Sequence, residues 1–250
     1  MELTLNNKKI FLPLGDILSY TRMLEHYWIK RFAGITKTDK VCDVACGNGF
    51  WSNKIAAISS FLVGIDLNEH RIAFANSKYS TKNRNQVAYL VADAQKLPLK
   101  TSSQTKVVSY CALEHFPSDI DALREMHRIL VKGGILAMSV DSMSLKGVAE
   151  EYLEFHRKKY FIHNYYTLAS LKEKLLQASF QIKEYRYLTT SRFSSYILKL
   201  AGKYRKLFQL LFPVFFPLTL FIDSVSNKQA GGHKLVIKAE AICNESCFSP

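Results

Sequence analysis

Residues 41–49, with the sequence VCDVACGNG, decide the fold of this 250-residue chain. Residues 40–45 form a short apolar run typical of a buried strand, which leads directly into a glycine-containing turn. A helical stretch follows at 50–58. Gly47 and Gly49 let the backbone turn tightly and approach a ligand, because glycine adopts conformations that other residues avoid. The stretch therefore predicts a strand, a ligand-binding turn and a helix in succession.

The same alternation of strand and helix continues along the chain. Apolar strands with little polar alternation, separated by helices, are typical of a parallel sheet covered on both faces. Right-handed crossovers then give a doubly wound α/β fold, which we expect to have seven strands, mostly parallel, with the last one antiparallel. The further expected strands are 61–66, 87–92, 106–110, 135–140, 181–188 and 234–240, and the further expected helices are 14–33, 69–79, 119–130 and 167–178.

Two carboxylates follow the second and third strands of this pattern. Asp66 ends the second strand, about twenty residues after the glycine turn, and Asp93 follows the third. In an open α/β sheet the ligand lies beyond the carboxyl ends of the strands. Asp66 can accept hydrogen bonds from the two hydroxyls of a ribose, and Asp93 can accept one from an exocyclic amine such as that of adenine. Each feature alone is also compatible with a tight turn or a helix cap, but together they predict a nucleoside site.

At this point the chain resembles the class I S-adenosylmethionine-dependent methyltransferases, which are Rossmann-like. The resemblance covers about 37–188 and is closest to the methyltransferase type 11 branch, which shares features with the ubiquinone and menaquinone methyltransferases. The stretches that carry it are VCDVACGNG at 41–49, GIDL at 64–67, VADAQKLPL at 91–99, VVSYCALEHF at 107–116 and ALREMHRILVKGG at 122–134.

The resemblance implies S-adenosylmethionine as the cofactor and a role for each matching residue. One departure from the family pattern is Ala45, which stands where most of the family has its first glycine, and we expect it to pack closely without loss of binding. The loop typical of the quinone branch after the fourth strand is missing, which argues against quinone chemistry itself. The implied cofactor-binding residues are Asp43, Ala45, Cys46, Gly47 and Gly49 for the methionine part, Asp66 and Leu67 for the ribose, Asp93 and Ala94 for the adenine, and Tyr110 and Cys111 for the floor near the sulfonium.

A sulfonium methyl group is already activated, so in-line transfer mainly requires alignment. A base is needed only if the acceptor must lose a proton. His115, in the loop after the fourth strand, is the best-placed histidine for that role, and the alternative is a histidine that caps or packs this loop. Other side chains that could face a substrate are His156, His163, Tyr160, Tyr165 and Tyr166.

The domain organisation predicted from these patterns is a single methyltransferase domain over 1–250. It comprises an N-terminal helical segment at 1–36, a cofactor-binding core at 37–141, and two insertions, 142–166 and 190–230, at the substrate rim. Strands five and six are expected to run parallel, so both insertions leave the sheet from the edge that carries the cofactor.

The composition adds expectations about compartment and partners. The N-terminus lacks the pattern of a secretory signal, and the five cysteines are an odd number, which favours a reduced, cytoplasmic protein. Cys243 and Cys247 could suggest a metal pair, but no second pair lies near them, and we predict no metal site. The net charge of +13 implies an acidic partner or simply a lysine-rich surface.

Residues 193–222 separate this chain from a general member of the resembling family. Apolar and aromatic side chains at 193–211 fall on one helical face and basic ones mainly elsewhere, and the apolar run that follows is broken by Pro213 and Pro217. This run is shorter than the ~20 residues of a spanning helix. The pattern is typical of a segment lying on an anionic membrane, and a lid or a dimer interface is the alternative. We therefore expect a small, lipid-like or lipid-linked acceptor, with the protein peripheral on the inner face of the membrane.

Three other functions are compatible with parts of this pattern. An RNA methyltransferase would explain the charge, but residues 109–112 read SYCA where enzymes that methylate base amines carry an Asn/Asp-Pro-Pro-aromatic motif. A methyltransferase-like module that binds a nucleoside or lipid without turnover is disfavoured by the intact acids. A nicotinamide dehydrogenase is disfavoured because Ser52 stands at the third glycine of that fingerprint.

Overall fold

The computed structural model describes residues 2–5, 8–11, 20–80, 86–144, 150–191, 193–194, 196–197, 211–225 and 231–242. Its centre is a seven-stranded sheet with the order β5-β4-β3-β6-β7-β9-β8. β9 runs antiparallel to both of its neighbours and the other pairings are parallel, which confirms the predicted doubly wound fold. The strands are β3 (Lys40–Val44), β4 (Phe61–Asp66), β5 (Val87–Val91), β6 (Gln104–Tyr110), β7 (Leu130–Asp141), β8 (Phe180–Leu188) and β9 (Lys234–Ala241).

Two hydrophobic cores form because successive strand residues point to opposite faces of the sheet. Val41 and Val108 belong to one core, whereas their neighbours Cys42 and Val107 belong to the other. Both faces are therefore covered, and the strands need the nearly continuous apolar sequence that predicted them. On the first face lie α2 (Tyr20–Ala33), α3 (Phe50–Ala56) and α4 (Glu69–Ala75); on the second lie α5 (Asp119–Ile129) and α7 (Leu168–Gln177).

Local sequence explains where several of these helices begin. The Asn68 and Ser118 side chains accept hydrogen bonds from backbone N–H groups in the first turns of α4 and α5. Thr167 and Ser170 form a reciprocal capping box at the start of α7. At the end of α4 the chain continues as a π-helical turn, η1 (Asn76–Ser80). These caps satisfy backbone N–H groups that have no partner inside the helix.

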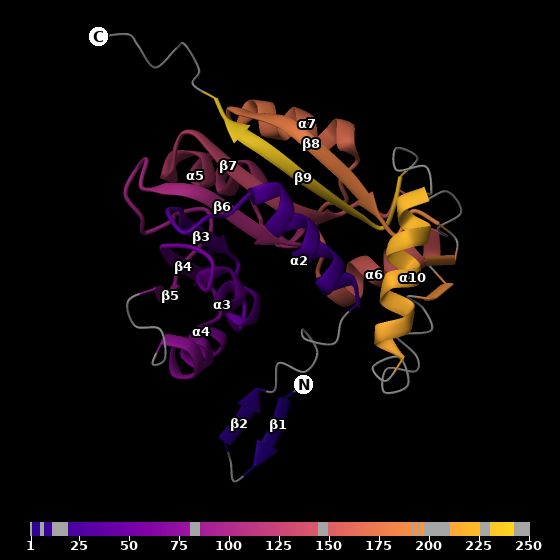
Figure 1. The fold of residues 1–250 in the computed structure, drawn as a ribbon, viewed down its shortest axis with the longest axis horizontal. Helices are drawn as coiled ribbons and strands as arrows, with labels where there is room; N and C mark the ends of the chain where they lie inside the picture. Colours follow the sequence, from indigo (N-terminus) through magenta and orange to yellow (C-terminus); the bar gives the residue numbers. More distant parts are fainter. Residues whose placement is uncertain are drawn as a thin grey trace.

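Both insertions leave the sheet at one point of this edge. Asp141, the last residue of β7, pairs with Lys234, the first of β9, which in turn pairs with Leu188 at the end of β8. The segments that connect these strands contain α6 (Glu150–Tyr160) and α10 (Phe212–Val225). Figure 1 shows α6 and α10 at the end of the sheet toward which β8 points, away from the end of β9. Both connecting segments therefore begin at the same end of the sheet, and the segment 142–166 contains a helix.

The N-terminal region differs from the prediction of a helical segment over 1–36. Only Tyr20–Ala33 is helical among its described residues, and a two-stranded antiparallel hairpin, β1 (Glu2–Leu5) with β2 (Lys8–Phe11), precedes it. The first nine residues are mainly polar, and a short two-stranded hairpin without a long apolar run was not predicted from them.

Within the described part of the chain, none of the helices has the length and apolar character needed to cross a bilayer. The predicted exclusion of a metal pair at Cys243 and Cys247 falls on residues outside those described.

Candidate functional site

Two cavities open at the carboxyl ends of β3, β4, β5 and β6, and Ala45 lines both. The first, of about 200 Å³, is lined by Arg22, Asp43, Ala45, Cys46, Gly47, Asn48, Trp51, Arg71 and Tyr110. The second, of about 290 Å³, is lined by Ala45, Ile65, Asp66, Leu67, Ala92, Asp93, Ala94, Gln95, His115, Phe116 and Pro117. Nine of the eleven predicted cofactor residues line one or both of these cavities, and the other two, Gly49 and Cys111, line neither.

The glycine turn needs left-handed backbone at three positions: Ala45, Gly47 and Gly49 have φ values of 61°, 58° and 74°. A Cβ atom on Gly49 would lie 2.7 Å from the ring of Tyr89, so this position excludes larger residues. Ala45 adopts a conformation that glycine prefers, which costs ~1–2 kcal/mol. The turn is thus shaped by close packing on one side and leaves its other side open to the cavities.

Asp66 ties this turn to the end of β4. Its Oδ2 accepts a hydrogen bond from the Gly47 N–H at 2.8 Å, and its Oδ1 accepts one from the Asn68 N–H at 2.9 Å. The carboxylate remains half-buried at the wall of the second cavity, and the neighbouring Leu67 is 73% exposed at its rim. Asp66 therefore holds the turn while still facing the cavity.

Asp93 lines the same cavity as Asp66. It is exposed, its Oδ1 accepts a hydrogen bond from the Gln95 N–H at 2.9 Å, and the Gln95 side-chain amide lies 3.2 Å from both of its oxygens. Ala94 and Phe116 supply apolar surface beside it. The two carboxylates thus lie around a single apolar space, which is the arrangement that a nucleoside requires.

Asp43 is a buried carboxylate in the wall of the first cavity. Ser52 Oγ donates to its Oδ2 at 2.5 Å, whereas Oδ1 is buried without a hydrogen-bond partner. Burial, together with the charge of Asp66, raises the pKa of Asp43 from 3.8 to about 7. A buried acceptor without a donor is costly, so this cavity suits a ligand that brings an N–H group, especially a cationic one.

Helix α2 adds to the first cavity Arg22, which was not predicted from the sequence, and packs His26 against two residues of its wall. Arg22 Nη1 donates to the Tyr110 carbonyl at 3.0 Å, and His26 Nδ1 lies 3.0 Å from the Tyr110 hydroxyl. The His26 ring stacks on Trp51 with centroids 4.4 Å apart. Burial and the charges of two lysines lower the pKa of His26 to about 4, so the His26 ring that stacks on Trp51 is uncharged at neutral pH. The mixed polar and apolar sequence of α2 gives no signal of which of its polar side chains lie next to a cofactor cavity.

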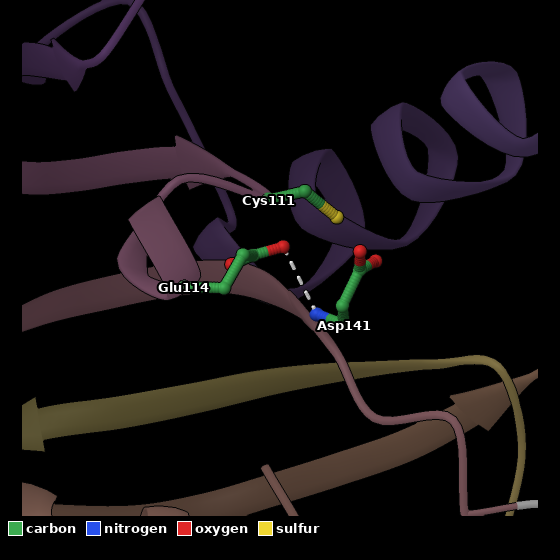
Figure 2. A group of neighbouring side chains, drawn as sticks. All are labelled: Cys111, Glu114 and Asp141. Atoms are coloured by element: carbon green, nitrogen blue, oxygen red, sulfur yellow. Dashed lines mark hydrogen bonds between the residues drawn. The ribbon is translucent and has the colours of Figure 1, made fainter. Parts of the chain in front are cut away.

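Beside this wall lies a buried cluster of ionisable side chains. Figure 2 shows Cys111, Glu114 and Asp141 converging from the end of β6, the following loop and the end of β7, and one ligand-type atom of each lies within 4.8 Å of the others. The Lys234 ammonium lies 3.0 Å from Cys111 Sγ and pairs with the Asp141 carboxylate. The cluster therefore contains its own cation.

The same lysine connects this cluster to α2. Lys234 Nζ lies 3.8 Å from Glu25 Oε1, and Glu25 Oε2 accepts a hydrogen bond from Arg22 Nη1 at 2.9 Å. Burial and the nearby Asp141 raise the pKa of Glu114 to about 8. The Lys234–Glu25 contact thus ties α2, which borders the first cavity through Arg22, to the first residue of β9.

The histidine predicted as a base lies at the second cavity. His115 is exposed, and its Nδ1 is 3.3 Å from the Phe161 carbonyl oxygen. It therefore shares a cavity with Asp66 and Asp93, whereas Tyr110 lines the first cavity. Among the other side chains considered for the substrate, Tyr166 is buried and donates to Asp119 Oδ2 at 2.7 Å, which is a structural role.

A family model described as "Methyltransferase domain" matches residues 42–138, which carry both acids and the glycine turn. Residues 42–138 are thus similar to this domain family. This match agrees with the resemblance to S-adenosylmethionine-dependent methyltransferases predicted from the sequence, and the sheet has the predicted seven strands with the last one antiparallel.

Curated relatives match the methyltransferase domain over part of their length. The demethylmenaquinone methyltransferase of Staphylococcus aureus is 30% identical over 137 residues, which are 52% of this chain and 55% of the relative. The chain thus spans about half the length of the curated relatives it matches.

Solved structures resemble nearly the whole chain in fold. A geranyl diphosphate C-methyltransferase from Streptomyces coelicolor, in complex with S-adenosyl-L-homocysteine, has a TM-score of 0.68 at 13% identity and covers 88% of this chain and 78% of its own. An S-adenosylmethionine-dependent methyltransferase from Mesorhizobium loti has a TM-score of 0.60 at 17% identity, covering 86% and 96%. At these identities the likeness is one of fold.

Proposed function

We propose that this protein transfers the methyl group of S-adenosylmethionine to a small, lipid-like acceptor. The observation that carries the proposal is the pair of adjoining cavities, one with the unpartnered Asp43 Oδ1 and the other with the carboxylates of Asp66 and Asp93. The donor set suits a ligand with a cationic amine at one end and a nucleoside at the other. S-adenosylmethionine has both parts.

The residues present fit this cofactor. Asp43 would accept hydrogen bonds from its ammonium group, Asp66 from the ribose hydroxyls, and Asp93 from the adenine amine. When bound, the cofactor supplies an activated methyl group on a sulfonium. The chain contributes alignment, and Trp51 and Tyr110, with His26 stacked on Trp51, form an aromatic part of the wall of the first cavity.

A proton must leave only if the acceptor is a hydroxyl or a similar group. We propose His115 as the base in that case, since it lines the second cavity and is accessible to solvent. Its contact with the Phe161 carbonyl would fix the ring orientation.

The lipid-like character of the acceptor is supported by two of the similar proteins. One is named for demethylmenaquinone and the other for geranyl diphosphate, and both names denote small molecules. The missing quinone-branch loop argues for an acceptor that is not a quinone. This part of the proposal concerns the chemical class and no particular compound.

A membrane surface as the place of the reaction is supported by α10, which overlaps the predicted 193–222 contact region. Val214, Leu218, Phe221 and Val225 recur on one helical stripe and are 65%, 41%, 65% and 68% exposed. The opposite side of α10 includes the buried Thr219. An exposed apolar stripe of this kind favours an interfacial position.

The experiment that tests the activity is incubation of the full-length protein with methyl-labelled S-adenosylmethionine and a lipid and metabolite extract. Labelled product in the lipid fraction is the expected result. Transfer to RNA alone would replace the proposed acceptor class, and absence of any labelled product from a protein that binds S-adenosylhomocysteine would reduce the protein to a non-catalytic binding module.

The membrane contact is tested by flotation with phospholipid vesicles. We expect the variant L218S/F221S to lose vesicle binding and to retain S-adenosylhomocysteine binding. Deletion of 193–222 should have the same effect, and unchanged flotation of both variants would remove this contact.

A further inference from the structure

The C-terminal end of α6 presents aromatic and basic side chains to solvent. Phe155, Tyr160 and Phe161 are 58%, 47% and 81% exposed, and Lys158 and Lys159 are exposed between them. We call these five residues the α6 face. Lys159 Nζ lies 5.3 Å from the ring centroids of both Phe155 and Tyr160, so the cation and the aromatic rings form a single patch.

Charge is distributed unequally along α6. Its first turn carries Glu150 and Glu151, and its last turn carries Arg157, Lys158 and Lys159. The positive end is therefore the end with the exposed aromatic rings. Large exposed aromatic side chains are costly in water and belong to a surface that is covered in use.

The α6 face is fixed to the rim of the methyltransferase site. Phe161 has a left-handed backbone with φ 53°, and the next N–H, that of Ile162, donates to the Arg157 carbonyl at 3.1 Å. The Phe161 carbonyl lies 3.3 Å from His115 Nδ1, and the His163 N–H donates to the Glu114 carbonyl at 2.8 Å. Phe161 is thus held outward while its backbone is tied to the loop that lines the second cavity.

The α10 stripe and the α6 face differ in chemistry. The sequence of α10, FPVFFPLTLFIDSV, contains one acidic residue and no lysine or arginine, so it offers apolar contact alone. The α6 face adds positive charge at the same edge of the sheet. Aromatic rings beside lysines are the composition found at the interface of an anionic bilayer.

We propose that the α6 face binds the headgroup region of an anionic bilayer and gives the protein its preference for negatively charged lipid. This inference rests on the proposed methyl transfer to a lipid-like acceptor, because it brings the rim of that site to the surface where such acceptors are dissolved. The lysines contact the lipid phosphates, and Phe155 and Phe161 insert among the headgroups.

The test is flotation of the full-length protein with phosphatidylcholine vesicles, with and without phosphatidylglycerol. Each lysine near anionic lipid contributes about fivefold to partitioning, so K158Q/K159Q should lower binding to phosphatidylglycerol vesicles by roughly 25-fold and leave binding to pure phosphatidylcholine unchanged. F155S/F161S should weaken binding to both vesicle types.

The matched control is K40Q/K132Q, which removes two exposed lysines at the beginning of β3 and near the beginning of β7, at the opposite edge of the sheet. Its binding should equal that of the unmodified protein. Equal losses in both double-lysine variants would show that net charge alone acts, and would overturn the assignment to α6.

Two further outcomes would also overturn it. One is unchanged binding of K158Q/K159Q to phosphatidylglycerol vesicles. The other is an unmodified protein that binds no vesicles but binds a single-stranded RNA, with that RNA binding lost in K158Q/K159Q. Calorimetry with S-adenosylhomocysteine on the same variants keeps this inference separate from the proposed function. Failure of the unmodified protein to bind that probe counts against the methyltransferase site, whereas altered vesicle binding with intact probe affinity concerns α6 alone.

Discussion

Replacing Asp66 by alanine is the sharpest perturbation of the proposed site. The substitution removes a carboxylate that accepts hydrogen bonds from the Gly47 and Asn68 N–H groups and that lines the cavity shared with Asp93. Two charge-assisted hydrogen bonds to a ribose contribute roughly 1.5–3 kcal/mol each. Because the side chain is only half-buried, water recovers part of this energy, and we expect affinity to fall at least tenfold, or about 1.4 kcal/mol.

The assay is isothermal calorimetry with S-adenosylhomocysteine, with circular dichroism to verify folding. Asp66→Asn is the informative companion, since its amide oxygen can still accept from Gly47 while its amino group cannot accept from a hydroxyl. Asp121→Ala controls for loss of a carboxylate elsewhere, because Asp121 is an exposed residue on α5. Unchanged affinity in a folded Asp66→Ala protein would refute the assignment of this carboxylate to the ribose.

Three further predictions concern other parts of the site. Asp43, with its pKa raised to about 7, is largely protonated below that pH, whereas an ammonium ligand requires the ionised carboxylate. The affinity for S-adenosylmethionine should therefore rise as the pH increases from 6 to 8. Calorimetry of Asp43→Asn should show no such dependence of affinity on pH. Lys234→Met leaves buried carboxylates without their cation and should lower the free energy of unfolding by about 3–5 kcal/mol in urea titration, whereas Lys238→Met, on the same strand in a more exposed pair, should cost less than about 1 kcal/mol. Gly49→Ala should destabilise the protein by about 2–4 kcal/mol, because it adds a steric clash to left-handed backbone strain. Gly34→Ala has the same backbone strain but open space around the new methyl group, and should cost only about 1–2 kcal/mol. Equal losses of unfolding free energy in the two variants would show that the clash at Gly49 is relieved.

The order of the strands and the position of the acids followed from sequence periodicity. Residues 61–66 and 87–91 are nearly continuous apolar runs because both faces of a doubly wound sheet are covered, and such runs are recognisable without a structure. Asp66 and Asp93 follow these runs directly. In a parallel sheet the ends of neighbouring strands meet, so sequence position alone brought these carboxylates to one edge.

Arg22, His26 and Lys234 could not be assigned in this way. They come from α2 and β9, outside the glycine turn in sequence. Each element contains several polar residues, and nothing in its sequence distinguishes these ones from the rest. Only the packing of α2 across the sheet and the antiparallel insertion of β9 next to β7 bring them to the cavity wall and the Asp141 carboxylate.

The chain by itself therefore determined the sheet, the glycine turn and the carboxylates at the strand ends, since these depend on contacts between residues close in sequence or on a repeating pattern. The tertiary structure decided which side chains complete the first cavity, which cation balances the buried acids, and that the exposed end of α6 lies beside His115. Such contacts join segments that are far apart in the sequence and share no repeating pattern. They form only when the helices pack on the sheet, so the sequence alone does not predict them.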